Sequence, residues 1–356
     1  TDVITLVGAP DIDRSAIARA LADATGAADV SLDELGGEEP LELDVSGWPA
    51  DAVAEALAPL GDGRIPASEA AGYLAELTLV HRLATQFDGA ASGWPDDVAR
   101  LRDALADQVR RDLETPWVWD AWGAAVTRED DADRPTVADE VLRWLEEIES
   151  ACPGGLPALG AGVHHAGALH TYGYLCSSLW TKYGWKRTRW VGGGVAAAAG
   201  IAPDLLRAVP PSGTLLGNAT TLVARLLGCE LPEDGRPVPH VEPTARLVGR
   251  VIEVATAVKR SDGEVPLEEP VEIRTSLFRS DRPAATRAPN LLVYTVVQEG
   301  VERLVTLFDV ADTKVESLLH PPPAELGEGT EVRLRYNAWL GGIGSTFVGR
   351  RSVTIT

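Results

Sequence analysis

The C-terminal part of the chain, residues 244–356, constrains the fold most, because it consists of β-type segments in close succession. Each segment is rich in valine, leucine, threonine or aromatic residues and ends near glycine, proline or aspartate, as β-strands do. Gln298-Glu299-Gly300 between two of them suits a hairpin turn. The predicted strands span residues 246–258, 271–279, 290–298, 303–310, 331–336 and 346–356. Such a succession predicts an antiparallel β-meander.

Residues 50–150 show a different periodicity, in which apolar residues recur every three or four positions, as in helices. In the clearest stretch, 70–87, the apolar positions are Tyr73, Leu74, Leu77, Val80, Ala84 and Phe87. Residues 98–109 follow the same rule, and a third helix is expected from Thr136, which has Asp139 three positions later. Helices followed by strands predict an α+β fold, with an N-terminal α-rich region and a C-terminal antiparallel β-meander.

Two domains are expected from these patterns. The first, residues 1–150, is mainly helical and has a short α/β start. The second, residues 151–356, combines a substrate-site segment at 151–230 with the antiparallel β-region at 244–356.

The α/β start is predicted from a strand, a helix and a second strand, at residues 3–7, 15–25 and 41–45. The order of strand, glycine-containing loop and helix resembles the opening of P-loop kinases. A P-loop has glycine and lysine where this chain has Asp13 and Arg14, although Ser15 stands in the Ser/Thr position. Asp13 and Asp11 also place negative charge where phosphates would bind. The resemblance therefore implies a strand–helix unit, with a degenerate P-loop nucleotide site as an alternative.

Composition narrows the class of protein. The formal net charge of −21 repels nucleic acid and anionic lipid at long range, so neither is an expected partner. No apolar run is long enough to cross a bilayer, and no basic segment followed by an apolar run opens the chain, so neither a membrane span nor a secretory signal is expected. The three cysteines, Cys152, Cys176 and Cys229, are far apart, which predicts a reducing, cytoplasmic location. The abundance of alanine, glycine, aspartate and arginine is typical of GC-rich bacteria.

The centre of the chain stands out by its charge. None of the 53 acidic residues lies between Glu149 and Asp204, where about eight would be expected from the composition. Basic, histidine and aromatic residues gather there instead. They are Lys182, Lys186, Arg187 and Arg189; His164, His165 and His170; and Tyr172, Tyr174, Trp180, Tyr183, Trp185 and Trp190. This coincidence predicts a functional site between His164 and Trp190. The alternative is a buried structural segment whose cations pair with acids from elsewhere.

The residue types suggest roles. Basic side chains hold a carboxylate or phosphate, aromatic rings stack on a planar ligand, and histidines transfer protons near neutral pH. The predicted substrate-binding residues are Arg187, Arg189, Lys182, Tyr183, Trp185 and Tyr174. His170, with Tyr172 and His165, is predicted to carry acid–base catalysis. Metal binding by His164, His165 and His170, or a purely structural role, is the alternative. Cys176 could be a nucleophile or a small buried hydrophobe.

Two finer expectations follow. If residues 183–189 form a strand, Tyr183, Trp185, Arg187 and Arg189 share one face and could stack a planar acid and hold its carboxylate. Otherwise these four side chains face solvent, or the two arginines pair with acids of the helical region such as Glu146 and Glu147.

Further along, Gly213, Thr214 and Asn218 precede a helical pattern. They could bind an anion at the helix start, or the helix could simply be capped there.

Together these features predict a small-molecule enzyme that acts on a carboxylated or phosphorylated planar metabolite by side-chain acid–base chemistry, as lyases, cyclases, isomerases and hydrolases do. No G-x-G-x-x-G follows a strand, which disfavours a nicotinamide oxidoreductase, and no cofactor is expected. A non-catalytic ligand-binding or sensor protein is the alternative. Residues 290–297 are apolar on both faces of a strand, which predicts a homodimer: helices would cover one face and a second subunit the other.

Overall fold

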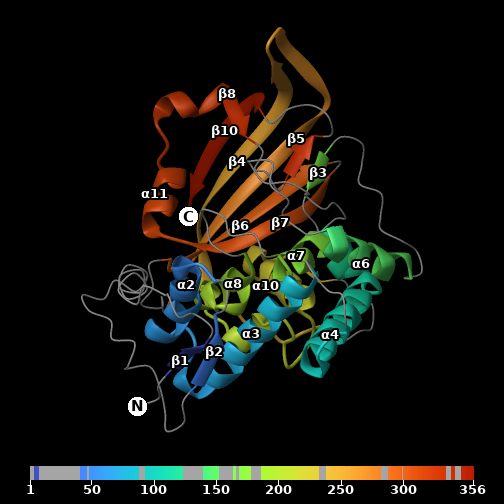
Figure 1. The fold of residues 1–356 in the computed structure, drawn as a ribbon. Helices are drawn as coiled ribbons and strands as arrows, with labels where there is room; N and C mark the ends of the chain where they lie inside the picture. The colour runs from blue at the N-terminus through green and yellow to red at the C-terminus, as the bar shows by residue number, and fades with distance from the viewer. Residues whose placement is uncertain are drawn as a thin grey trace.

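The structure is a computed structural model. It describes residues 4–7, 41–45, 48–87, 93–122, 139–151, 163–165, 168–177, 186–231, 238–281, 288–298, 300–333, 338–340 and 346–356. In these parts of the chain a helical body packs beneath an antiparallel sheet, and the N-terminal strands lie on the side of the helical body away from the sheet (Figure 1). This arrangement confirms the predicted α+β fold.

The helical body is built from short and medium helices. They are α2 (Ala50–Gly61), α3 (Ala70–Phe87), α4 (Asp96–Leu113), α5 (Pro116–Trp122), α6 (Asp139–Ser150), α7 (Ala168–Leu175), α8 (Lys186–Val191), α9 (Gly194–Ala199) and α10 (Leu215–Leu227), with the 3-10 turns η1 (Ala67–Glu69) and η2 (Pro203–Leu206). α3 and α4 confirm two predicted helices, because the apolar positions that predicted them are buried. Within the described residues, no helix is long and apolar enough to span a membrane.

The two ends of the predicted helical region are only partly described. α6 is the predicted third helix and is described from Asp139, whereas Thr136 lies outside the described residues. β1 (Ile4–Val7) and β2 (Leu41–Asp44) confirm the predicted strands and pair in parallel. The helix predicted at 15–25 and the P-loop-like residues Asp13 to Ser15 lie outside the described residues.

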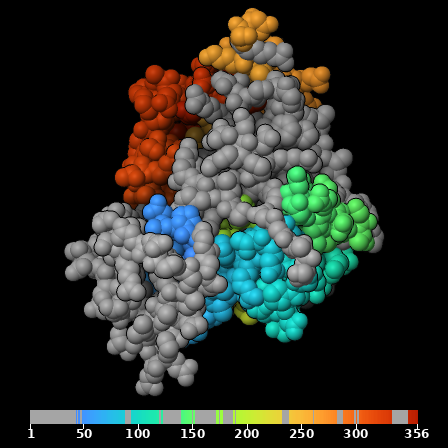
Figure 2. Space-filling model, in the orientation of Figure 1, coloured from blue at the N-terminus to red at the C-terminus, as the bar shows by residue number. Residues whose placement is uncertain are grey.

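The main sheet has the strand order β7-β6-β5-β4-β10-β8, and all neighbouring strands are antiparallel. Its strands are β4 (Ala245–Arg260), β5 (Gly263–Ser280), β6 (Asn290–Gln298), β7 (Val301–Val310), β8 (Gly327–Arg333) and β10 (Thr346–Ile355). The first four form the predicted meander. After β7 the chain passes through α11 (Asp312–Leu319) and η3 (Pro323–Glu325), which were not predicted, and reaches the opposite edge of the sheet. The turn between β4 and β5 projects beyond the rest of the sheet (Figure 2).

The sheet separates two apolar clusters. On β6, Leu291 and Val293 belong to the core that continues into the helical body, and α9 is the helix that packs against β5, β6 and β7. Leu292 and Tyr294 belong to the second cluster, on the other face, which includes Val315 of α11. Both faces of β6 are therefore buried within one chain. The apolar character of this strand therefore does not require a second subunit, and the homodimer stays an untested prediction.

Candidate functional site

The three histidines of the central segment lie on two different elements. His164 and His165 belong to β3 (Val163–His165), which pairs antiparallel with β9 (Ala338–Leu340), so that His165 is opposite Ala338. His170 lies in the first turn of α7. Their side chains are outside the described part of the structure, so their predicted roles in catalysis or metal binding remain predictions. The described side chains contain no group of three or more potential metal ligands.

The predicted strand at 183–189 is wrong at its C-terminal end, because Lys186–Val191 forms the helix α8. Residues two positions apart in a helix point in nearly opposite directions, so Arg187 and Arg189 do not share a face. The alternation of aromatic and basic residues was therefore not a strand signal. Lys182, Tyr183 and Trp185 lie outside the described residues, as do the side chains of Arg189 and Tyr174.

Arg187 is the residue of this segment whose surroundings are best defined. Its side chain is only 1% exposed, although it carries a charge. One terminal nitrogen, Nη1, donates to the backbone oxygen of Ser177, just after α7, at 3.2 Å. The other, Nη2, lies 3.0 Å from Nδ1 of His81 on α3. The guanidinium thus joins α8 to α3 and to the end of α7.

Two further residues complete the cluster. Glu55 of α2 accepts a short hydrogen bond from the hydroxyl of Thr188, the residue after Arg187. The indole of Trp48 lies against the His81 ring, with centroids 4.8 Å apart and planes inclined by 54°. Glu55, His81 and Arg187, called the Glu55–His81–Arg187 cluster below, come from three helices: His81 lies against Arg187, and Glu55 is bonded to the next residue and acts on the charge of Arg187.

The electrostatics of the cluster follow from burial. Burial lowers the pKa of Arg187 to about 10, although Cys176 and Glu55 oppose this shift. Arg187 is thus still a cation at neutral pH. Burial also raises the pKa of the Cys176 thiol to about 12, although the positive charge of Arg187 acts in the opposite direction. A buried, protonated thiol is a poor nucleophile, so the geometry favours the structural alternative for Cys176.

Tyr172 lies in a separate buried network. Its hydroxyl donates to Oδ2 of Asp112 on α4 at 2.5 Å, and the residue is 2% exposed. The other oxygen of Asp112 accepts from the hydroxyl of Thr214 at 2.5 Å. Burial, together with the nearby Asp112, holds the pKa of the Tyr172 hydroxyl well above its ordinary value. Tyr172 is therefore a link between α7 and α4, and its predicted catalytic role receives no support from this geometry.

The start of α10 is a capped helix rather than an open anion site. Thr214 is its N-cap, and its Oγ1 accepts from the backbone nitrogen of Gly217 at 2.9 Å. The amide oxygen of Gln108 accepts from the backbone nitrogen of Leu215 at 2.9 Å. With the Asp112 carboxyl also at this end, protein groups already satisfy the helix start, as expected for a capped terminus.

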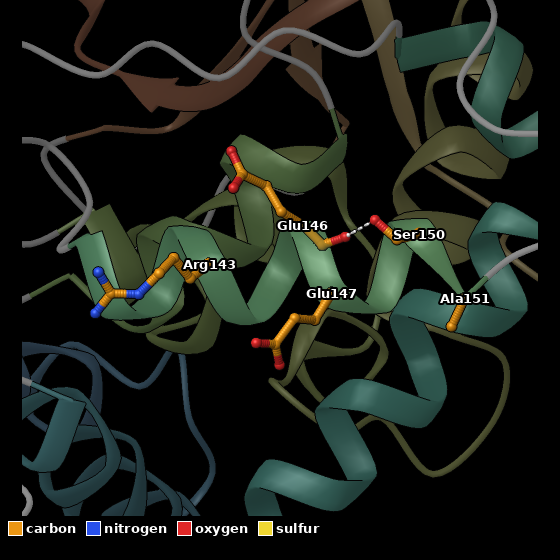
Figure 3. A pocket seen from close by; sticks show the side chains of 5 residues that line it. All are labelled: Arg143, Glu146, Glu147, Ser150 and Ala151. Atoms are coloured by element: carbon orange, nitrogen blue, oxygen red, sulfur yellow. Dashed lines mark hydrogen bonds between the residues drawn. The ribbon is translucent and has the colours of Figure 1, made fainter.

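A hollow of about 490 Å³ along α6 and its C-terminal end is lined by Arg143, Glu146, Glu147, Ser150 and Ala151. All five residues are exposed. Figure 3 shows Glu146 and Glu147 pointing to opposite sides of the helix, while the Ser150 hydroxyl donates to the backbone oxygen of Glu146 at 2.8 Å. These side chains do not converge on a common point, so the hollow has the character of open surface.

The sequence interpretation missed His81 and Glu55. His81 lies four positions after Leu77 and three before Ala84, at the edge of the apolar face of α3, and this placement was an available signal. Glu55 lies in an alanine-rich helix and gave no comparable signal. Comparison with known protein families, curated proteins and solved structures finds no match for this chain.

Proposed function

We propose that the protein is an enzyme for a small, planar, anionic metabolite and that the Glu55–His81–Arg187 cluster forms the centre of its site. Its chemistry would be the side-chain acid–base type found in lyases, cyclases, isomerases and hydrolases. The single observation that carries the proposal is the guanidinium of Arg187, buried beside a histidine. Burying a cation costs free energy, and proteins often accept this cost where a charge serves a ligand.

The path of the chain also supports this location. The hydrogen bond from Arg187 to the backbone oxygen of Ser177 joins the described residues on either side of the stretch 178–185. This stretch contains Lys182, Tyr183 and Trp185, which remain predicted substrate-binding residues. A planar acid held near Arg187 would thus find aromatic and basic residues nearby in the chain.

Binding can be tested first with benzoate and phenyl phosphate, two minimal planar anions, by isothermal titration calorimetry. Replacing Arg187 by lysine keeps the charge but removes the two-pronged donor that holds Ser177 and His81 in place, so Arg187→Lys is expected to weaken binding about tenfold to a hundredfold. Arg225→Gln, which changes an exposed arginine on α10, is the control and should bind like the wild type. Circular dichroism would establish that each variant is folded.

Turnover can then be tested by incubating the purified protein with a deproteinised cell extract and following small anions by mass spectrometry. The wild type and Arg225→Gln should consume a planar anion, and His81→Gln should consume it at least about tenfold more slowly, as expected when the imidazole of the site is lost. Binding of the probes without any consumption would instead favour the non-catalytic binding protein. If neither binding nor consumption occurs, the proposal is wrong.

A further inference from the structure

The contact between Arg187 and His81 fixes how the histidine carries its proton. A guanidinium has five N–H donors and no acceptor, whereas each ring nitrogen of a neutral imidazole is either a donor or an acceptor. At 3.0 Å from Nη2 of Arg187, Nδ1 of His81 must therefore accept. The proton of the neutral ring is then on Nε2.

The surroundings keep the ring neutral. An imidazolium would have to place an N–H against the N–H of Arg187, and two cations would lie side by side in a half-buried position. Arg187 on α8 and Glu55 on α2 are charged groups at the pair. Glu55 is engaged by the hydroxyl of Thr188, and the uncharged ring of Trp48 packs against His81. The Cys176 thiol near Arg187 is protonated and adds no charge at neutral pH.

We infer that His81 serves as a neutral hydrogen-bond donor through Nε2–H and that Arg187 is the positioning residue that enforces this tautomer. Such a donor stabilises an oxygen that gains negative charge, for example the carbonyl oxygen of an acid or ketone when an enolate forms. Proton removal would then fall to Glu55, the carboxylate of the cluster. The role toward a ligand rests on the proposed function, whereas the tautomer itself does not.

The tautomer can be measured directly by NMR on protein labelled with ¹⁵N in its histidines. Protonated and unprotonated ring nitrogens resonate in separate ¹⁵N ranges, so the two nitrogens of His81 report which one carries the proton. His81→Gln identifies the signal by its disappearance. The exposed His240 and His320 provide reference signals in the same spectrum.

At about pH 7 we expect His81 to show one protonated nitrogen, Nε2, and one unprotonated nitrogen, Nδ1. This pattern should persist at about pH 5.5, where an ordinary histidine with a pKa near 6.5 is mostly protonated. In Arg187→Gln, which lacks the cation, the ring should gain a second proton at the lower pH. In Arg187→Lys, which keeps a charged donor, the neutral Nε2–H form should be retained.

Ligand contact is read in the same spectrum, because added benzoate should shift the Nε2 signal of the wild type. A proton on Nδ1, a doubly protonated ring at neutral pH, or identical titrations in the wild type and Arg187→Gln would overturn the inference. Each of these results could occur while benzoate still binds, so the proposed function would survive them. Conversely, a protein that binds and converts nothing would leave the ligand-free tautomer signals unchanged.

Discussion

Asp112 illustrates how a single buried residue links protonation to stability. It is 2% exposed, and its oxygens accept from Tyr172 and Thr214. Burial raises its pKa from 3.8 to about 7, although these two hydrogen bonds and the charge of Arg111 act in the opposite direction. Between these pH values the folded protein holds a proton that the unfolded chain has lost. The stabilisation from this group is therefore complete below about pH 3.8, falls as the pH rises to about 7, and is then constant.

Replacing this carboxyl by an amide should remove that pH dependence. Asp112→Asn is expected to cost about 1 kcal/mol near pH 5, since one hydrogen bond is weakened, and to cost less or even stabilise near pH 8, where the wild type buries a charge. Urea unfolding at several pH values measures both effects. Asp103→Asn, an exposed residue of the same helix, should leave the pH profile unchanged. Parallel profiles for Asp112→Asn and the wild type would contradict this assignment.

At this scale the sequence predicted a site segment, 164–190, which stays a prediction. It placed Arg187 in the site, and the structure surrounds that residue with a histidine and a carboxylate. It could not distinguish Tyr172, which is committed to Asp112, from an accessible acid–base group. It also missed His81, because Arg187, which this histidine contacts, lies 106 positions away in the chain.

At the scale of elements, the spacing of apolar residues predicted a helix correctly where the helix buries one face and exposes the other. The stretch 70–87 repeats its apolar residues at helical spacing and forms α3, whose predicted apolar positions are buried. The stretch 183–189 has residues of alternating type, but its C-terminal part belongs to the helix α8, in which Arg187 and Thr188 are both buried. The spacing of polar and aromatic residues does not distinguish a helix from a strand well, because the burial of these residues depends on partners far away in the chain.

The short helix α9 shows how an element can depend on one missing side chain. A Cβ added to Gly194 would lie 2.6 Å from Oδ2 and 2.9 Å from Oδ1 of Asp309 on β7, so the Asp309 carboxyl group would have to turn away or the helix and strand move apart. Gly194→Ala is expected to destabilise the protein by about 1–3 kcal/mol, as overpacking does, and thermal unfolding would measure it.

The matched control for this prediction is Gly72 on α3. An added Cβ there would meet Nη1 of Arg207 at 3.6 Å, which is an ordinary contact. Because alanine has the higher helix propensity, Gly72→Ala should stabilise the protein by up to about 1 kcal/mol. An equal loss of stability in both variants would show that close packing on Asp309 is not the cause.

At the scale of the whole molecule, the order of strands was beyond the sequence. Each strand was predicted from its own residues, but β10 lies between β4 and β8, so that Val353 is opposite Val251 across a separation of about a hundred residues. The residues of a strand do not show which edge of the sheet it joins. Pairing at either edge would form the same kind of backbone hydrogen bonds. The crossing through α11 is what moves the chain to that edge.

Because one apolar core joins the helical body to the sheet, we expect the two parts to unfold together. Phe278 of β5 is fully buried in the same cluster as Leu77 of α3. Phe278→Ala should cost about 3–5 kcal/mol. In hydrogen-exchange mass spectrometry, peptides from α3 should lose protection together with peptides from β6, since cooperative units exchange together. Val265→Ala, an exposed position on the same strand, should change neither. Loss of protection confined to the sheet would instead indicate two independently stable parts, and the boundary between them would then lie between the helices and β4.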